Sequence, residues 1–170
     1  MNILFLGAGR RIGMAERFIA KGHTLFSVES SLNNPIASYA KVFVTGKWCD
    51  ATEDILKIIK ENKIDLVIPF QDEAVLLCAR IKEATKLDMF PVPDVTTANR
   101  CFDKGWFAEW FANNESCKQF YPFPVVNGTP LFPMMIKPRQ GFGSRGNYYV
   151  VKTLEEYNTF IDNYNNAPKL

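Results

Sequence analysis

The chain has 170 residues, of which 47% are hydrophobic and 22% are charged, and its formal net charge is +2. This length holds one ordinary domain or two small ones. The small net charge gives no electrostatic reason to expect nucleic acid or an anionic membrane as a partner. No apolar run is long enough to cross a bilayer, and the opening MNILFLGAGRR lacks the charge order of a signal peptide. We therefore expect a cytoplasmic protein.

The cysteines and the histidine predict neither a metal site nor a nucleophilic one. The four cysteines form no CxxC pair, and His23 is the only histidine. A zinc site needs about four clustered Cys, His or acidic ligands. A single histidine without a nearby nucleophile also disfavours a Ser-His-Asp or Cys-His site. We expect reduced, mostly buried thiols.

Strand and helix patterns alternate through the first half of the chain. Apolar runs predict strands over residues 2–6, 24–28, 41–45 and 65–68, and apolar stripes predict helices over residues 10–21, 51–62 and 73–84. Short strands that alternate with helices indicate an α/β fold. We expect a Rossmann-like, doubly wound parallel sheet with right-handed crossovers.

The pattern changes after Met89, where FPVPDVTTANR reads as a connector because it holds two prolines. We place the domain boundary near residues 92–100, with one domain over 1–95 and a small α+β domain over 96–170. In the second domain we expect a helix over 103–113, strands over 134–137 and 147–152, and a last helix that begins at Thr153 with a capping-box pattern. The aromatic stripe of the first of these helices is expected in the core: Trp106, Phe107, Trp110 and Phe111.

A first glycine-rich turn, GAGRRIG, follows the first strand and opens the first helix. Gly7 and Gly9 allow the backbone to turn sharply and to approach a ligand, and a helix N-terminus favours an anion. Glu29 ends the second strand, where a dinucleotide-binding fold places the acid that contacts ribose. The third glycine comes one residue later than in GxGxxG, so a tight turn without a ligand explains the pattern equally well. Gly7, Gly9, Arg10 and Glu29 are therefore candidates for substrate binding.

A second glycine-rich segment, IKPRQGFGSRG, carries more chemistry. Lys137 ends a strand, and a loop with three glycines, a serine and two arginines follows. Backbone N–H groups of such a loop can form an anion-binding concavity, while lysine and arginine side chains suit phosphate oxygens. The lysine precedes the glycines, so this is not the GxxxxGK[ST] loop. The alternative is an ordinary glycine hairpin with a solvated basic tip.

KPRQGFGSRG between two strands resembles the small-lobe phosphate loop of ATP-grasp enzymes, in particular of carbamoyl-phosphate-synthase large-subunit-like proteins. The opening MNILFLGAGRR and the segment DLVIPFQDEA resemble the pre-ATP-grasp domain of that family. Asp103-Lys104 resembles its DK pair, in which the first ATP-contacting lysine starts a helix. The resemblance implies ATP contacts by Lys104, Lys137, Gly141, Gly143, Ser144, Arg145 and Gly146.

The resemblance also implies a function for the parent protein. It implies an ATP-dependent carboxylate–amine ligase that works through an acylphosphate, with ATP and a small carboxylate as ligands, and it leaves a homodimer open. A full ATP-grasp unit has a second, large lobe with the Mg²⁺ ligands and a catalytic arginine. We expect that lobe to be missing here, so the truncated chain alone is expected to be inactive, with no metal ligands of its own. Two other functions stay open: an NAD(P)-dependent oxidoreductase that uses the first glycine turn, and a non-catalytic nucleotide-binding module.

Overall fold

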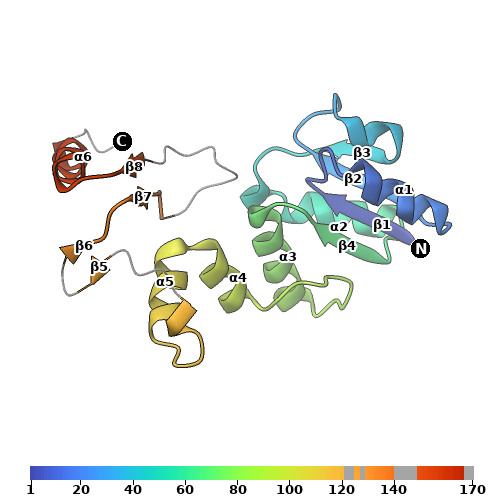
Figure 1. Ribbon diagram of the computed structural model, residues 1–170. Coiled ribbons are helices and arrows are strands. Elements are labelled where there is room, and N and C mark those ends of the chain that lie inside the picture. Colours follow the sequence, from blue (N-terminus) through green and yellow to red (C-terminus); the bar gives the residue numbers. More distant parts are fainter. Residues whose placement is uncertain (121–124, 127–128, 140–148, 167–170) are drawn as a thin grey trace. The chain divides into compact units, whose positions relative to one another are not determined.

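The structure is a computed structural model of the chain, and it describes all residues except 121–124, 127–128, 140–148 and 167–170 (Figure 1). The chain divides into two compact units, Met1–Phe102 and Asp103–Leu170. No helix in the described ranges is long and apolar enough to cross a membrane.

A parallel sheet of four strands forms the centre of the first unit, in the order β3-β2-β1-β4. The strands are β1 (Asn2–Leu6), β2 (Thr24–Glu29), β3 (Lys41–Val44) and β4 (Leu66–Pro69). In the middle of the sheet, Leu4 of β1 lies opposite Phe26 of β2 and Val67 of β4. The predicted Rossmann-like parallel sheet is confirmed.

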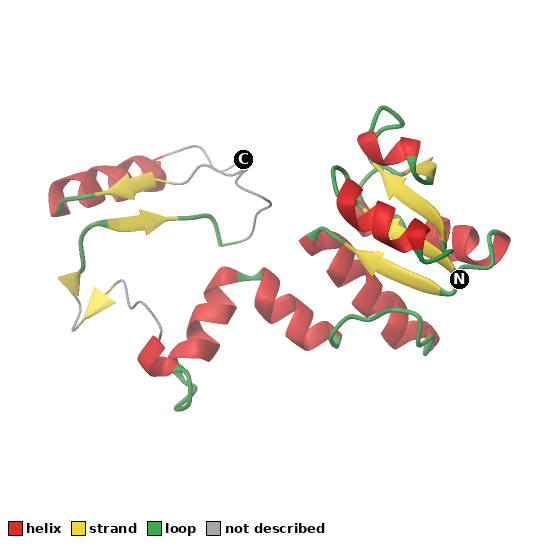
Figure 2. Cartoon of the chain, turned by 45° about the vertical axis from the view of Figure 1, so that its right-hand side comes forward, coloured by secondary structure: helices red, strands yellow, loops and turns green. Residues whose placement is uncertain are grey.

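Helices cover both faces of this sheet (Figures 1 and 2). They are α1 (Ile12–Ala20), α2 (Thr52–Glu61) and α3 (Asp72–Thr85), with short 3-10 turns η1 (Pro35–Ser38) and η2 (Trp48–Asp50). Phe5 packs in one cluster with Ala15 of α1, whereas Leu4 packs in another with Ile55 of α2 and Leu77 of α3. Because neighbouring residues of β1 point to opposite faces, each face of the sheet has its own buried core.

Strand β4 ends the sheet on one side, and its outer edge has a covering segment. The Phe70 N–H donates to the Leu6 carbonyl at 2.9 Å, toward β1. The Val67 N–H points the other way and donates to the Met89 carbonyl at 2.9 Å. The chain therefore returns along the outside of β4 after α3 ends.

The prediction of a connector after Met89 is wrong over its second half, where α4 (Val95–Phe102) forms. The two prolines only precede this helix. Asp94 follows them and caps it, since its carboxylate accepts from the Thr97 N–H and from the Thr97 hydroxyl, both at 2.8 Å. The helix packs on α3 through Ala98, which is 5% exposed, so α4 lies in the first unit rather than after a boundary at residue 95.

The second unit mixes helices with short antiparallel strand pairs. Its helices are α5 (Lys104–Ala112), η3 (Lys118–Phe120) and α6 (Leu154–Asn166), and its strand pairs are β5 (Val125–Val126) with β6 (Thr129–Pro130) and β7 (Met134–Ile136) with β8 (Tyr149–Val151). The predicted capping box at the start of α6 is present in part: the Glu156 N–H donates to the Thr153 hydroxyl, but the Glu156 carboxylate accepts from the N–H of Lys152 and not of Thr153. The expected α+β character of this unit is therefore confirmed.

The aromatic stripe of α5 is not in a core, contrary to the prediction. No residue of this helix is buried, and Trp106 and Phe107 are each 37% exposed. The rings contact one another instead, with 5.5 Å between the ring centres of Phe107 and Phe111. Among the described residues of the second unit, Val151 is the one buried hydrophobic residue, so there is little core for the stripe to join.

Candidate functional site

The first glycine-rich turn connects β1 to α1 and depends on two left-handed residues. Gly7 has φ +70° and Gly9 has φ +55°, a region that other residues adopt at a cost. Gly7 is also crowded, because a Cβ atom there would lie 2.7 Å from the side chain of Gln71. The turn therefore needs glycine at residue 7 for both conformation and space.

The carboxylate of Glu29 is bonded to this turn. Its Oε1 accepts from the Gly9 N–H at 3.2 Å and from the Ser27 hydroxyl at 2.7 Å, and its Oε2 accepts from the Asn34 amide at 3.1 Å. Glu29 is only 3% exposed, whereas Arg10 is exposed. The structure thus brings Gly9 and Glu29 together, and a backbone donor of the turn already serves a carboxylate of the protein.

Gln71 is a site residue that the sequence did not single out by itself. It follows β4, and its Oε1 accepts from the Trp48 indole N–H at 2.8 Å while its side chain covers Gly7. In open α/β sheets, ligands bind outside the carboxyl ends of the strands, and β1 and β4 end here. The available signal was a polar residue directly after a buried strand in the segment PFQDEA.

The predicted phosphate-binding residues belong to the second unit. Lys104 is the first residue of α5, Lys137 follows β7, and both are exposed. Gly141, Gly143, Ser144, Arg145 and Gly146 lie outside the described residues. Of the predicted ATP contacts, the structure therefore locates the two lysines.

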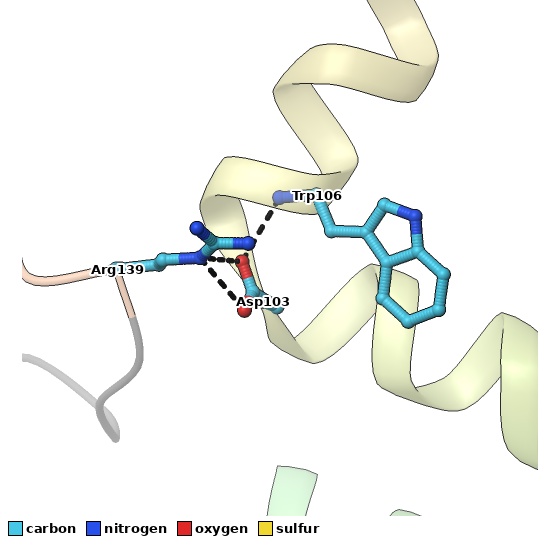
Figure 3. A network of polar contacts seen from close by, with 3 residues as sticks. All are labelled: Asp103, Trp106 and Arg139. Atoms are coloured by element: carbon cyan, nitrogen blue, oxygen red, sulfur yellow. Dashed lines mark hydrogen bonds and ion pairs between the residues drawn. The ribbon is translucent and has the colours of Figure 1, made fainter.

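Three hydrogen bonds join the start of α5 to Arg139, two residues after Lys137, and Figure 3 draws the two that Asp103 accepts. Asp103 is the N-cap of α5, and its Oδ1 accepts from the Trp106 N–H at 2.9 Å. The same carboxylate accepts from Arg139 Nε at 2.7 Å and 2.9 Å. In addition, the Lys104 N–H donates to the Arg139 carbonyl at 3.0 Å. We call Asp103, Lys104 and Arg139 the α5–β7 junction.

The junction concentrates positive charge beside a helix N-terminus. Lys104 and Lys137 supply exposed cationic side chains, whereas the Lys104 and Trp106 N–H groups of the first turn already donate to Arg139 and Asp103. The carboxylate of Asp103 is paired with Arg139, and its side chain is 12% exposed. This arrangement favours an anionic ligand with several negatively charged oxygens.

The described residues do not fit a magnesium site. Mg²⁺ prefers carboxylate and other oxygen ligands. Within the described ranges, no group of three or more His, Cys, Asp or Glu side chains is placed to hold a metal ion. Asp103, the carboxylate at the junction, is bonded to Arg139 and to the backbone of α5.

Comparison of the sequence with protein-family models gives no match, and no curated protein matches either. Solved structures do match the fold. N5-carboxyaminoimidazole ribonucleotide synthetase from Thermus thermophilus aligns over 92% of this chain with a TM-score of 0.61 and 19% identity. L-amino acid ligase from Bacillus licheniformis aligns over 98% with a TM-score of 0.66 and 15% identity.

The ADP complex of N5-carboxyaminoimidazole synthetase from Staphylococcus aureus also aligns over 98% of the chain, with a TM-score of 0.66 and 12% identity. The chain spans less than half of these structures: 42% of the first, 42% of the second and 45% of the third. At the level of the fold, the chain is thus similar to the matched parts of these three enzymes.

Proposed function

We propose that the chain forms the ATP-binding part of an ATP-dependent carboxylate–amine ligase of the carbamoyl-phosphate-synthase-like kind. In such a reaction a carboxylate oxygen attacks the γ-phosphorus of ATP, and the bond to ADP breaks. The acylphosphate then reacts with an amine, which displaces phosphate from the carbonyl carbon and loses a proton. In this proposal, Lys104 and Lys137 hold the phosphates of ATP and neutralise their negative charge while the γ-phosphoryl group is transferred.

The observation that carries the proposal is the α5–β7 junction. Lys104 and Lys137 are 33 positions apart in the sequence, and one of them starts a helix while the other leaves a strand. The Lys104 N–H bonds the carbonyl of Arg139, so the two lysines belong to one local structure. Two exposed cations on one local structure suit a polyphosphate better than a singly charged ligand.

The likeness in fold adds support for the nucleotide. The similar structures include ligases, and one of them holds ADP. The residues that would bind Mg²⁺ and the residues that would catalyse the reaction are not assigned to this chain in the proposal. The contacts of the phosphates with the loop are proposed from the sequence motif alone, and they involve Gly141, Gly143, Ser144, Arg145 and Gly146.

The alternative of an NAD(P)-dependent oxidoreductase has a physical argument against it. A dinucleotide fold uses free N–H groups of its first glycine turn to bind the pyrophosphate. Here the Gly9 N–H donates to Glu29, and Gln71 covers Gly7. In the proposal, these residues therefore hold no nucleotide phosphate, and of Gly7, Gly9, Arg10 and Glu29 it is the exposed Arg10 that contacts the small carboxylate substrate.

The test compares two lysines of the same strand pair. Lys137 leaves β7 toward the glycines, and Lys152 follows β8. We expect Lys137→Ala to weaken Mg-ATP binding about ten- to hundred-fold, because a hydrogen bond to a charged partner contributes about 1.5–3 kcal/mol. Lys152→Ala removes the same charge and should leave the affinity within about two-fold of the unchanged chain. Chemical-shift changes of the Lys104 and Lys137 amides during an ATP titration measure the affinity even when it is weak.

Equal effects of the two substitutions would show that the strand pair is ordinary surface, and the proposal would fail. A parallel titration with NADH distinguishes the oxidoreductase alternative from the proposed ATP site. Saturable NADH binding that Glu29→Ala abolishes would favour the oxidoreductase, whereas we expect no NADH site.

A further inference from the structure

Arg139 makes its contacts backward along the chain, toward the start of α5. Its side chain is 66% exposed, yet Nε lies 2.7 Å and 2.9 Å from the two carboxylate oxygens of Asp103. An exposed arginine gives up much rotamer freedom to hold one such geometry. Figure 3 shows the guanidinium directed at the carboxylate, beside the first turn of α5.

Gly105 leaves room for this arrangement. A Cβ atom on Gly105 would lie 2.8 Å from Arg139 Nε, 3.0 Å from Cζ and 3.2 Å from Cδ. Glycine is a poor helix former, and Gly105 occupies the second position of α5. The absence of a side chain there lets the Arg139 side chain lie against the helix.

We propose that Arg139 is a positioning residue that ties the chain after Lys137 to the start of α5. Its bond to Asp103, its carbonyl bond to the Lys104 N–H and its fit over Gly105 hold Lys104 and Lys137 at one ligand. This inference rests on the proposed ATP site and names what keeps its two cations together. Arg139 acts through Asp103, and a direct bond from Arg139 to phosphate is the alternative.

The two roles of Arg139 predict opposite effects of Asp103→Asn. Asparagine still caps the helix, because its side-chain oxygen accepts the Trp106 N–H, but it loses the ionic bond to Arg139. If Arg139 positions the lysines, Mg-ATP affinity should fall about ten-fold. If Arg139 binds phosphate directly, loss of a negative charge near the ligand should leave the affinity unchanged or raise it.

Gly105→Ala provides a second variant that changes no charge. Alanine is the better helix former, so α5 should form at least as well. The added methyl group, however, displaces the Arg139 side chain from Asp103. We expect weaker Mg-ATP binding together with faster hydrogen exchange of the Lys104 amide, whose bond to the Arg139 carbonyl reports on the junction directly.

The experiment is an NMR titration of the 170-residue chain with Mg-ATP, followed at the Lys104 and Lys137 amides. Asp162→Asn, an exposed aspartate of α6, is the matched control and should leave the affinity unchanged. Weaker binding in both Asp103→Asn and Gly105→Ala, with no further loss when Asp103→Asn is combined with Arg139→Gln, supports the positioning role.

Two results would overturn the inference and tell it apart from the proposed function. If the unchanged chain binds ATP but Asp103→Asn and Gly105→Ala bind it as well or better, Arg139 does not position the lysines and the ATP site still stands. If ATP shifts neither lysine amide in the unchanged chain, the ATP site itself is wrong, and the positioning role falls with it.

Discussion

Cys78 lies inside the first unit, on the face of α3 that packs against the sheet, and it is 0% exposed. Burial raises the pKa of its thiol to about 12, because the charged thiolate is disfavoured away from water. The thiolate is the reactive form, and at pH 8 it would be about one in ten thousand of the Cys78 population. Burial thus makes this thiol both inaccessible and unreactive.

We therefore expect a thiol reagent near neutral pH to modify Cys101, which is exposed, and to spare Cys78. Peptide mapping after timed labelling measures both sites in one sample. Cys101→Ser should remove the early label. Modification of Cys78 in the folded protein at the rate of Cys101 would contradict its burial.

The role of a single residue was predictable where it belongs to a local sequence motif. It was not predictable where it depends on a bond to a residue far along the chain. Lys104 and Lys137 stand in recognisable local motifs. The bond between Asp103 and Arg139 joins residues 36 positions apart, and the bond of Glu29 to Gly9 joins residues 20 apart. Such pairs depend on how the elements pack, which local spacing does not contain.

At the scale of elements, α4 depends on Asp94. Hydrogen bonds from the Thr97 backbone N–H, and then from the Thr97 side chain, lower the pKa of this carboxyl below its ordinary value of 3.8. A lowered pKa in the folded state means that the ionised form is favoured by folding. The contribution of Asp94 to stability is therefore complete above about pH 3.8 and is lost as the pH falls below that value.

Melting temperatures measured against pH test this cap. Asp94→Ala should melt at a lower temperature than the unchanged chain near neutral pH, because α4 loses its cap. The difference should shrink as the pH falls below 3.8. Asp94→Asn keeps an accepting oxygen, so its melting temperature should fall by less than that of Asp94→Ala. A difference that stays constant through acid would show that the charge of Asp94 has no part in the effect.

Elements with a strong periodic pattern were the easiest to predict from sequence. The four parallel strands lie within one or two residues of their predicted ranges, because continuous apolar runs that end in glycine or proline leave little choice. Helix α4 was missed because Pro91 and Pro93 were read as breakers of the whole segment. In fact a proline constrains itself and the residue before it, and Asp94 can begin a helix directly afterwards.

At the scale of the whole molecule, the two units differ in how much core they hold. Among the described residues, both hydrophobic clusters of buried side chains lie in the first unit, on the two faces of its sheet. In the described part of the second unit, Val151 is the one buried hydrophobic residue. Burial of apolar area is the main favourable term in folding, so the first unit should account for most of the stability.

We expect residues 1–102 alone to unfold cooperatively, with a melting temperature within a few degrees of that of the whole chain. Residues 103–170 alone should show no cooperative transition. Circular dichroism melts of the two pieces and of the whole chain measure this. A first piece that melts gradually, without a sharp midpoint, would show that its core depends on the second unit.

The layered arrangement of the first unit was predictable because the alternation of strands and helices leaves few topologies open. The division of the chain was harder to predict. The prolines near residue 92 marked a change in composition, whereas the contacts divide the chain after Phe102. A helix belongs to the unit on which it packs, and α4 packs on α3.

The outer edge of β4 affects whether copies of the protein can associate by pairing their strands. An edge strand recruits foreign strands through its unpaired N–H groups. On this edge the Val67 N–H is taken by Met89, and the next outward residue, Pro69, has no N–H to offer. The edge of β4 therefore presents no strand donor at these positions, and the sheet is protected there against edge-to-edge aggregation at high concentration.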